Sequence, residues 1–294
     1  MSLLDEKTAF TRPVGAASAR APVRPADATG GIPLPREHGA WGLLLQPFVA
    51  SVIVARQFDW LLLPALALAL LGFVLREPLV VLSRQRWVWR TRNPQSSIAA
   101  RWVAWELAGI SVCLVVLGWQ VPIPSLIVLT AVALALTLVA VWCTVKNLQR
   151  SIPLQIVSTA GLGSTALLVA LVLTGAIPAW AWQLWALLTM HAVATILVVH
   201  ARLRSRVAAR TGEGGSPRAG ALAAQGVQFV SAAVLAVLTS AVVMAVPLVF
   251  SALVNTLELL RLSSGRGLTE SLTRVGYRTL AVSLVHMGFA IAVL

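Results

Sequence analysis

Long apolar runs, separated by short polar or charged segments, follow one another along most of this 294-residue chain. Most of the runs are about 15–25 residues long, which is the length that an α-helix needs to cross the hydrocarbon core of a bilayer. The pattern therefore predicts an all-α fold, a polytopic transmembrane helical bundle of about nine helices. We place these helices at residues 39–56, 59–76, 101–119, 122–143, 153–175, 179–201, 221–245, 248–262 and 278–294.

The stretch 221–262 allows two interpretations. It is almost unbroken apolar sequence, too long for one crossing of about 20 residues. Pro247 lies within it, and proline cannot donate the backbone hydrogen bond that a helix interior needs. A single crossing would also move Arg261 and Arg278 to the side opposite the other basic segments. We therefore predict a hairpin of two helices on either side of Pro247.

The few charges of the chain are strongly basic. Only 11% of the residues are charged, whereas an ordinary soluble domain has about 25%. A net charge of +13 would suggest nucleic acid in a soluble protein, but the positive-inside rule explains it better here, and we expect no nucleic-acid partner. With the N-terminus in the cytoplasm and the C-terminus outside, 22 of the 23 Lys and Arg residues lie at or near the cytoplasmic side, and only Arg56 lies outside. The basic connections are residues 77–100, 144–152, 202–220 and 261–278.

The composition also divides the chain. Residues 1–34 are rich in Ala, Pro and Gly and lack the compact apolar core of a signal peptide. We expect a disordered cytoplasmic tail at 1–34 and a single transmembrane helical domain at 35–294. The prediction is therefore a multi-pass protein of the inner (plasma) membrane, whose first partner is the lipid bilayer.

Metal and cofactor signals are weak. Cys113 and Cys143 are too few for a disulfide framework or a thiolate metal site, and no histidine and carboxylate share metal-ligand spacing on one helix. His191 and His286 lie near the middle of their helices. Hydrogen bonds between helices explain these two histidines better than a bis-histidine haem site does. We therefore predict no metal and no cofactor.

Polar side chains form a stripe on nearly every predicted helix, mostly in its cytoplasmic half. In hydrocarbon such side chains are costly and face the bundle interior. No Asp follows Asp59, and each Glu near the inner boundary has an arginine close to it in the sequence. Two interpretations stay open: the pairs anchor helix ends, or they form a pocket in which arginines bind an anion and glutamates orient the arginines.

The segment PREHGAW at residues 35–41 favours the pocket. Arg36 gains nothing from the dipole at a helix start, and His38, Gly42 and Gln46 form one stripe that runs inward. Pro47 should kink the helix there. We expect residues of the first, second and third helices to converge on one cytoplasm-facing pocket, whereas no catalytic residue can be assigned. The candidate ligand-binding residues are Arg36, Glu37, His38, Gln46, Arg76, Glu77, Glu106 and Arg202.

The segment PREHGAWGLLLQPF resembles the start of the YwiC-like membrane proteins, a bacterial family. Shorter segments from residue 75 to the last helix are similar too, so that the resemblance runs from about residue 33 to the C-terminus. It implies a polytopic inner-membrane protein but no reaction. Two positions depart from the family's pattern: His200 stands where Arg is usual, and Gln155 stands where Glu is frequent.

The inferred topology is also similar to that of the UbiA-type prenyltransferases. Their chemistry needs two Asp-rich clusters, because Mg²⁺ prefers carboxylate and phosphate oxygens. The corresponding loops of this chain contain no Asp. The resemblance therefore allows a UbiA-like helical scaffold but argues against Mg²⁺-dependent prenyl transfer.

Three functions remain open. The first is a pocket for an anionic lipid or metabolite headgroup, or a role in assembly with another membrane subunit. The second is a membrane-embedded transferase on a UbiA-like scaffold that acts on an anionic lipid without Asp-rich Mg²⁺ sites, with Glu77 or Glu106 as acid or base. The third is a small-anion transporter. No internal repeat favours transport and no nucleophile–base pair favours an enzyme, so the first function is preferred.

Overall fold

The computed structural model of the protein describes residues 38–89, 95–148, 151–211, 218–239, 242–264 and 268–294. Contacts divide the chain into residues 1–32 and 33–294, and all of the described residues belong to the second unit. The predicted tail at residues 1–34 lies outside the described residues. Within them every regular element is a helix, which confirms the all-α prediction.

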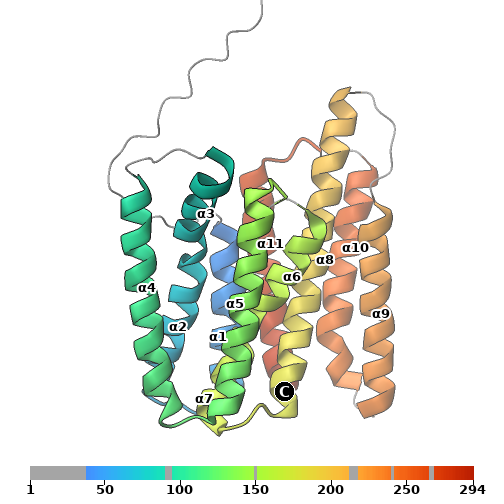
Figure 1. The fold of residues 1–294 in the computed structure, drawn as a ribbon. Helices are drawn as coiled ribbons and strands as arrows, with labels where there is room; N and C mark the ends of the chain where they lie inside the picture. The colour runs from blue at the N-terminus through green and yellow to red at the C-terminus, as the bar shows by residue number, and fades with distance from the viewer. Residues whose placement is uncertain (1–37, 90–94, 149–150, 212–217, 240–241, 265–267) are drawn as a thin grey trace, which may run out of the picture. The chain divides into compact units, whose positions relative to one another are not determined.

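Nine helical segments, some divided by short breaks, make up the described part of the chain (Figure 1). The first half contains α1 (His38–Ala55), α2 (Leu62–Val74), α3 (Arg76–Arg84), η1 (Gln85–Trp89), α4 (Gln95–Gly118) and α5 (Ile123–Val145). The second half contains α6 (Ile152–Gly163), α7 (Thr165–Thr174), α8 (Ala179–Thr211), α9 (Ala219–Thr239), η2 (Val242–Ala245), α10 (Val246–Ser263) and α11 (Leu272–Val293). Each predicted helix corresponds to one of these segments.

Two predicted loops are largely helical, and these predictions were wrong. Residues 76–89 continue α2 as α3 and η1, and α4 begins at Gln95 rather than at residue 101. The α8 helix runs to Thr211 instead of ending near residue 201. Arginine is a good helix former, and its long side chain keeps its charge in water while the stem lies along an apolar surface. The basic segments therefore extend the helices instead of ending them.

Proline stands at a helix start in the predicted hairpin and inside the helix at the position of the predicted kink. The α10 helix begins at Val246 with Pro247 in its first turn, where a missing N–H costs no helix bond. The α1 helix, in contrast, continues through Pro47 to Ala55. The predicted helix at 153–175 is divided at Ser164 into α6 and α7.

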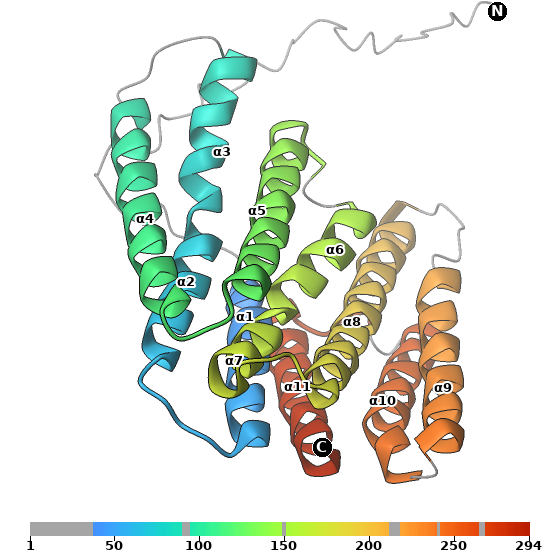
Figure 2. The ribbon, with the colours of Figure 1, turned by 60° about the horizontal axis from the view of Figure 1, so that its bottom comes forward.

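The interior of the bundle is built around α7, all of whose residues from Thr165 to Val172 are buried. The α1 helix contacts α6, α7, α8 and α11. Ser51 of α1 donates a hydrogen bond to the Ala166 carbonyl at 2.9 Å, and the Thr165 hydroxyl donates to the Leu44 carbonyl at 2.9 Å. Two interhelical hydrogen bonds therefore fix α1 against α7. Figure 2 shows α7 beside α1 near one end of the bundle.

The outer helices carry the surface expected of a membrane protein. Eight segments are long and apolar enough to cross a bilayer, and the shorter apolar helix Gly39–Ala55 is the ninth. In α4 and α5 only 17% of the most apolar window is buried within the protein, and large apolar residues such as Val112, Val128 and Val132 are exposed. Contact of such a surface with lipid costs little free energy, whereas its exposure to water is unfavourable. The chain is therefore a multi-pass membrane protein.

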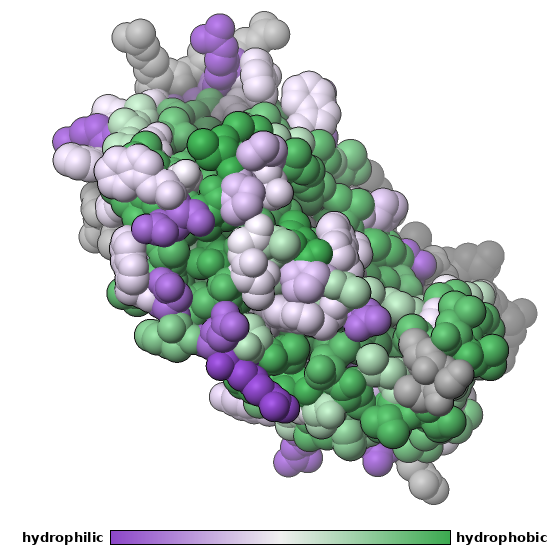
Figure 3. Space-filling model, turned by 90° about the horizontal axis from the view of Figure 1, so that it is seen from below, coloured by the Kyte–Doolittle hydropathy of each residue, from purple (hydrophilic) through white to green (hydrophobic). Residues whose placement is uncertain are grey.

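Successive segments run in alternating directions (Figure 1). The ends of η1, α5, α8 and α10 consequently lie at one end of the bundle, and the C-terminus lies at the other end. Figure 3 shows that other end, where hydrophobic residues cover much of the face and hydrophilic residues are scattered over it. The basic segments are thus gathered at a single end, as the topology prediction requires.

Candidate functional site

The first three residues of the predicted pocket, Arg36, Glu37 and His38, lie at or before the start of the described part of the chain. Arg36 and Glu37 lie outside the described residues, and of His38 only the backbone, the first residue of α1, is described. Gln46 lies two turns further along α1 and is half-buried. The predicted pocket at the start of α1 therefore stays a prediction.

Arg76 and Glu77 are the first two residues of α3, and Arg76 contacts the neighbouring helix α5. The Arg76 guanidinium lies 3.9 Å from the Glu77 carboxylate, and its Nη2 donates to the Thr144 hydroxyl at 3.2 Å. Arg84, two turns later, donates through Nη2 to the Thr144 carbonyl at 3.1 Å. Thr144 is thus the point on α5 to which two arginines of α3 bind.

Glu106 lies on α4 and is buried, with 3% of its surface exposed. Both of its carboxylate oxygens are buried and form no hydrogen bond to a described residue. The α4 helix packs on α2 and α3, and Gly109, one turn after Glu106, allows a close approach to Leu71 of α2. The structure therefore places Glu106 between α4 and these two helices.

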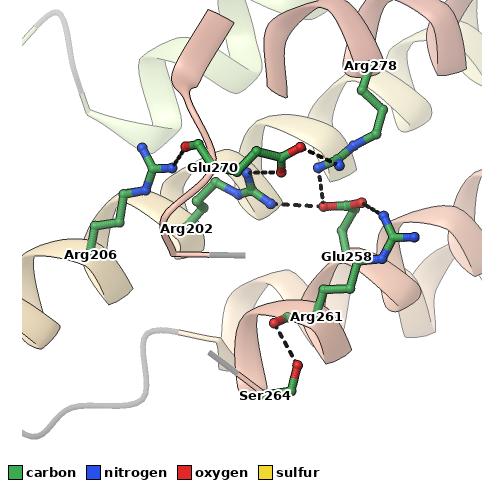
Figure 4. A network of polar contacts seen from close by, with 7 residues as sticks. All are labelled: Arg202, Arg206, Glu258, Arg261, Ser264, Glu270 and Arg278. Atoms are coloured by element: carbon green, nitrogen blue, oxygen red, sulfur yellow. Dashed lines mark hydrogen bonds and ion pairs between the residues drawn. The ribbon is translucent and has the colours of Figure 1, made fainter. Parts of the chain in front are cut away.

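Arg202, another residue of the predicted site, is buried and bonds to two carboxylates (Figure 4). Its side chain on α8 is only 3% exposed. Nη2 donates to Glu258 Oε2 at 3.0 Å and Nη1 donates to Glu270 Oε2 at 3.2 Å. Arg278 of α11 binds the same two carboxylates, at 2.7 Å to Glu258 and 3.0 Å to Glu270. Two arginines and two glutamates thus form a closed ring of four charge-assisted hydrogen bonds.

Two further arginines extend this ring. Arg261, which is 59% exposed, donates to Glu258 Oε1 at 3.1 Å from one turn further along α10. Arg206, one turn after Arg202 on α8, donates to the backbone carbonyl of Glu270. The segment before α11 is therefore held at α8 through both the side chain and the backbone of Glu270. We call Arg202, Arg206, Glu258, Arg261, Glu270 and Arg278 the arginine network.

The arginine network depends on structural features that the sequence pattern did not predict. Arg202 and Arg206 are on one face only because α8 continues as a helix to Thr211, where residues four apart are neighbours. Glu258 and Arg261 pair within α10 at a spacing of three residues, whereas the contacts of Glu258 with Arg202 and Arg278 cross between helices. Glu270 lies in the connection before α11, where no periodicity predicts a partner. The net charge of the segment 261–278 was the only available signal.

A pocket of ≈ 850 Å³ lies against the arginine network at the ends of α10 and α11. Four of its lining residues are arginines and one is a glutamate. Arg274 is exposed and forms no ion pair with another described residue. The residues that line this pocket are Arg202, Leu257, Leu260, Arg261, Ser264, Thr269, Glu270, Ser271, Arg274 and Arg278. A second hollow of ≈ 500 Å³ lies next to it, on the side of Arg206 and Arg210, and shares Thr269, Glu270 and Ser271.

The electrostatics of Glu270 follow from its partners. Burial disfavours its ionised form, but the hydrogen bonds and positive charges of Arg202 and Arg278 outweigh burial and lower the pKa of Glu270 below its usual value. Glu270 is therefore ionised at neutral pH and holds both arginines in place.

The lowered pKa of Glu270 predicts a pH dependence of stability. A group whose pKa falls on folding stabilises the protein above its unfolded pKa, about 4.3 for Glu, and this contribution is lost as the pH falls through the lower folded value. We expect Glu270→Gln to lower the thermal unfolding midpoint of the detergent-purified protein at about pH 7. The difference from the wild type should shrink as the pH is taken below about 4. A difference that stays constant from about pH 7 to below pH 4 would show that the Glu270 charge contributes nothing.

A second buried polar cluster joins α8, α10 and α11, which carry the arginine network, to α9. His191 of α8 and His286 of α11 are stacked, with ring centroids 4.3 Å apart. His191 Nδ1 lies 2.7 Å from the Ser251 hydroxyl of α10 and Nε2 lies 3.0 Å from the Ser283 hydroxyl of α11. Gln228 of α9 donates to Ser251 at 3.0 Å. These contacts confirm that His191 bonds between helices, and among the described residues no group of three or more metal-ligating side chains is found.

Comparison with known families supports the predicted resemblance in the first half of the chain. The model of a family described as YwiC-like protein matches residues 34–170. The match confirms the predicted resemblance over α1 to α6 and the first part of α7, which includes Gln46, Arg76, Glu77 and Glu106. The arginine network lies beyond the matched residues. No curated protein and no solved structure matched the chain.

His200 and Gln155, at which the sequence analysis expected departures from the YwiC-like pattern, are in contact with each other. His200 Nε2 of α8 lies 2.7 Å from Gln155 Oε1 of α6. This pair thus forms a neutral polar contact between α6 and α8.

Proposed function

We propose that this multi-pass membrane protein, YwiC-like over residues 34–170, binds an anionic group in the pocket beside the arginine network. The observation that carries the proposal is an excess of positive charge. Arg202, Arg261, Arg274 and Arg278 line the pocket, against the carboxylates of Glu258 and Glu270. Four positive and two negative charges leave a net charge of +2, which a ligand of opposite charge would balance. The ligand chemistry is a phosphate or carboxylate group.

The geometry suits such a ligand for two reasons. Arg202 and Arg278 are already fixed by Glu258 and Glu270, so little side-chain freedom is lost when an anion binds beside them. Guanidinium groups offer paired N–H donors that match the oxygens of phosphate or carboxylate. The hydroxyls of Ser264, Thr269 and Ser271 also line the pocket and supply neutral donors.

Arg274 gives the cleanest test of anion binding, because it lines the pocket without forming an ion pair to a described residue. We expect inorganic phosphate to raise the thermal unfolding midpoint of the detergent-purified protein, since a ligand of the folded state stabilises it. Arg274→Gln should weaken phosphate binding about tenfold while leaving the midpoint without phosphate unchanged.

Arg101→Gln is the matched control for Arg274→Gln, because Arg101 is an exposed arginine on α4 whose side chain, among the described residues, donates to the Ser97 carbonyl of its own helix. This variant should keep the full phosphate effect. The proposal is contradicted if phosphate does not raise the unfolding midpoint of the wild type. It is also contradicted if Arg101→Gln and Arg274→Gln reduce this rise equally, since phosphate would then act through the general charge of the protein.

The proposal includes an orientation in the inner membrane, with the arginine-rich end of the bundle in the cytoplasm. It is supported by the Lys and Arg distribution, which places the basic connections at one end. Single cysteines at Ser264 and Gln57, in a chain without Cys113 and Cys143, can be labelled with an impermeant thiol reagent in intact cells. Labelling is expected at position 57 only. Labelling at position 264 from outside would reverse the orientation.

A further inference from the structure

The pocket beside the arginine network has an apolar side that a soluble anion would not need. Leu257 and Leu260 of α10 line it and are 56% and 58% exposed. Both belong to the candidate membrane span Val242–Ser263, so their exposed surface faces hydrocarbon near the end of the span. The pocket therefore has arginines on one side and a lipid-facing helix surface on the other.

This helix surface continues from the pocket into the span. Leu260, Leu257, Leu253 and Phe250 follow one another at steps of three, four and three residues, so they lie on one face of α10. Leu253 is also exposed. The ring of Phe250 contacts that of Phe289 on α11, with centroids 5.1 Å apart. We call Phe250, Leu253, Leu257 and Leu260 the α10 stripe.

The length of the α10 stripe corresponds to one leaflet. Ten residues separate Phe250 and Leu260, and a rise of 1.5 Å per residue gives about 15 Å. This is about half of the roughly 30 Å hydrocarbon core. An acyl chain that starts at the level of the pocket would thus reach the Phe250–Phe289 pair near the middle of the bilayer.

We propose that the anion of the pocket is the headgroup of an anionic glycerophospholipid, which enters sideways from the bilayer with an acyl chain along the α10 stripe. This inference rests on the proposed function and specifies its ligand. The excess of arginines matches a phosphodiester with net negative charge, and selects it over a zwitterionic headgroup, whose ammonium group the arginines would repel. The exposed leucines let the chain stay in hydrocarbon while the headgroup sits among the arginines.

The test compares three ligands on the same purified protein. Native mass spectrometry measures the occupancy of dioleoyl phosphatidylglycerol and of dioleoyl phosphatidylcholine, which have equal chains and different headgroups. The thermal shift with inorganic phosphate measures the headgroup site without a chain. The wild type is expected to bind phosphatidylglycerol at least about tenfold more tightly than phosphatidylcholine.

Two matched variants separate the chain from the headgroup. Leu257→Gln, in the α10 stripe, should lower phosphatidylglycerol occupancy about tenfold and leave the phosphate shift unchanged. Val227→Gln on α9, where the side chain is 59% exposed, should change neither. Arg274→Gln should weaken both ligands.

Each other outcome identifies what fails. If phosphate binds and Leu257→Gln has no effect on phosphatidylglycerol, the lipid inference is overturned while the anion pocket stands. Equal binding of the two phospholipids, or equal losses in Leu257→Gln and Val227→Gln, also overturns the lipid inference. If neither phosphate nor phosphatidylglycerol binds, the proposed function fails together with the inference.

Discussion

Replacing Arg202 with methionine is expected to lower the free energy of unfolding by about 2–3 kcal/mol, among the largest effects of any single change in the chain. Breaking a buried ion pair from one side usually costs about 3–5 kcal/mol, because the remaining charge is left without its partner. The effect is placed below that range because Glu258 and Glu270 are 15% and 18% exposed and both keep Arg278. Methionine keeps the length and packing of the aliphatic stem.

Arg261→Met is the control for Arg202→Met, since both arginines bind Glu258. Arg261 is mostly exposed and forms a pair within one helix, for which about 0.2–1 kcal/mol is typical. Unfolding in mixed micelles with increasing SDS measures both free energies. Equal losses in the two variants would mean that burial of Arg202 gives it no special role.

Replacing His191 with alanine is expected to cost about 2–4 kcal/mol. His191 is 3% exposed, and its two ring nitrogens bond to Ser251 and Ser283 on different helices. The change leaves a cavity beside His286 and removes this partner from the buried Ser251 hydroxyl and the half-buried Ser283 hydroxyl, and each of these effects costs energy. Each hydrogen bond between membrane helices is worth about 0.6–2 kcal/mol, so the two lost bonds and the cavity both contribute to the expected loss.

His200→Ala provides the comparison for His191→Ala. His200 is half-buried and contacts Gln155 through one nitrogen, so about 1 kcal/mol is expected. The same SDS titration applies. If His200→Ala destabilises the protein as much as His191→Ala, the stacked pair is not a specific point of stability.

The helical segments were predictable from hydrophobic pattern, and their ends were not. Apolar runs of membrane length and the position of Pro247 indicated the nine segments and the hairpin of α9 and α10, because lipid imposes a minimum length on each crossing. The continuation of α8 beyond residue 201 is rich in arginine, and in α3 the short apolar run 78–82 stands between charged residues, so neither shows the long apolar pattern of a separate crossing. Helix propensity without burial is a weak guide, and the sequence therefore predicted loops there.

The candidate site was predictable in its chemistry more than in its place. Sparse acids beside arginines indicated a polar cluster at the basic end, and Arg202 belonged to the candidates. Its partners Glu258, Glu270 and Arg278 are separated from it by 56, 68 and 76 residues, and only the packing of α8 against α10 and α11 brings them together. Helical spacing predicts neighbours within one helix and gives no information on which helices meet.

An experimental density map of the protein extracted with its native lipids tests the anion pocket most directly. The account predicts density for an anionic group within about 3 Å of the guanidinium groups of Arg274 and Arg278, with a chain along α10. The competing position is the pocket that the sequence suggested, formed by residues of the first three predicted helices, among them Arg76, Glu77 and Glu106. Density for a ligand at that position, with water alone beside Arg274 and Arg278, would contradict the account.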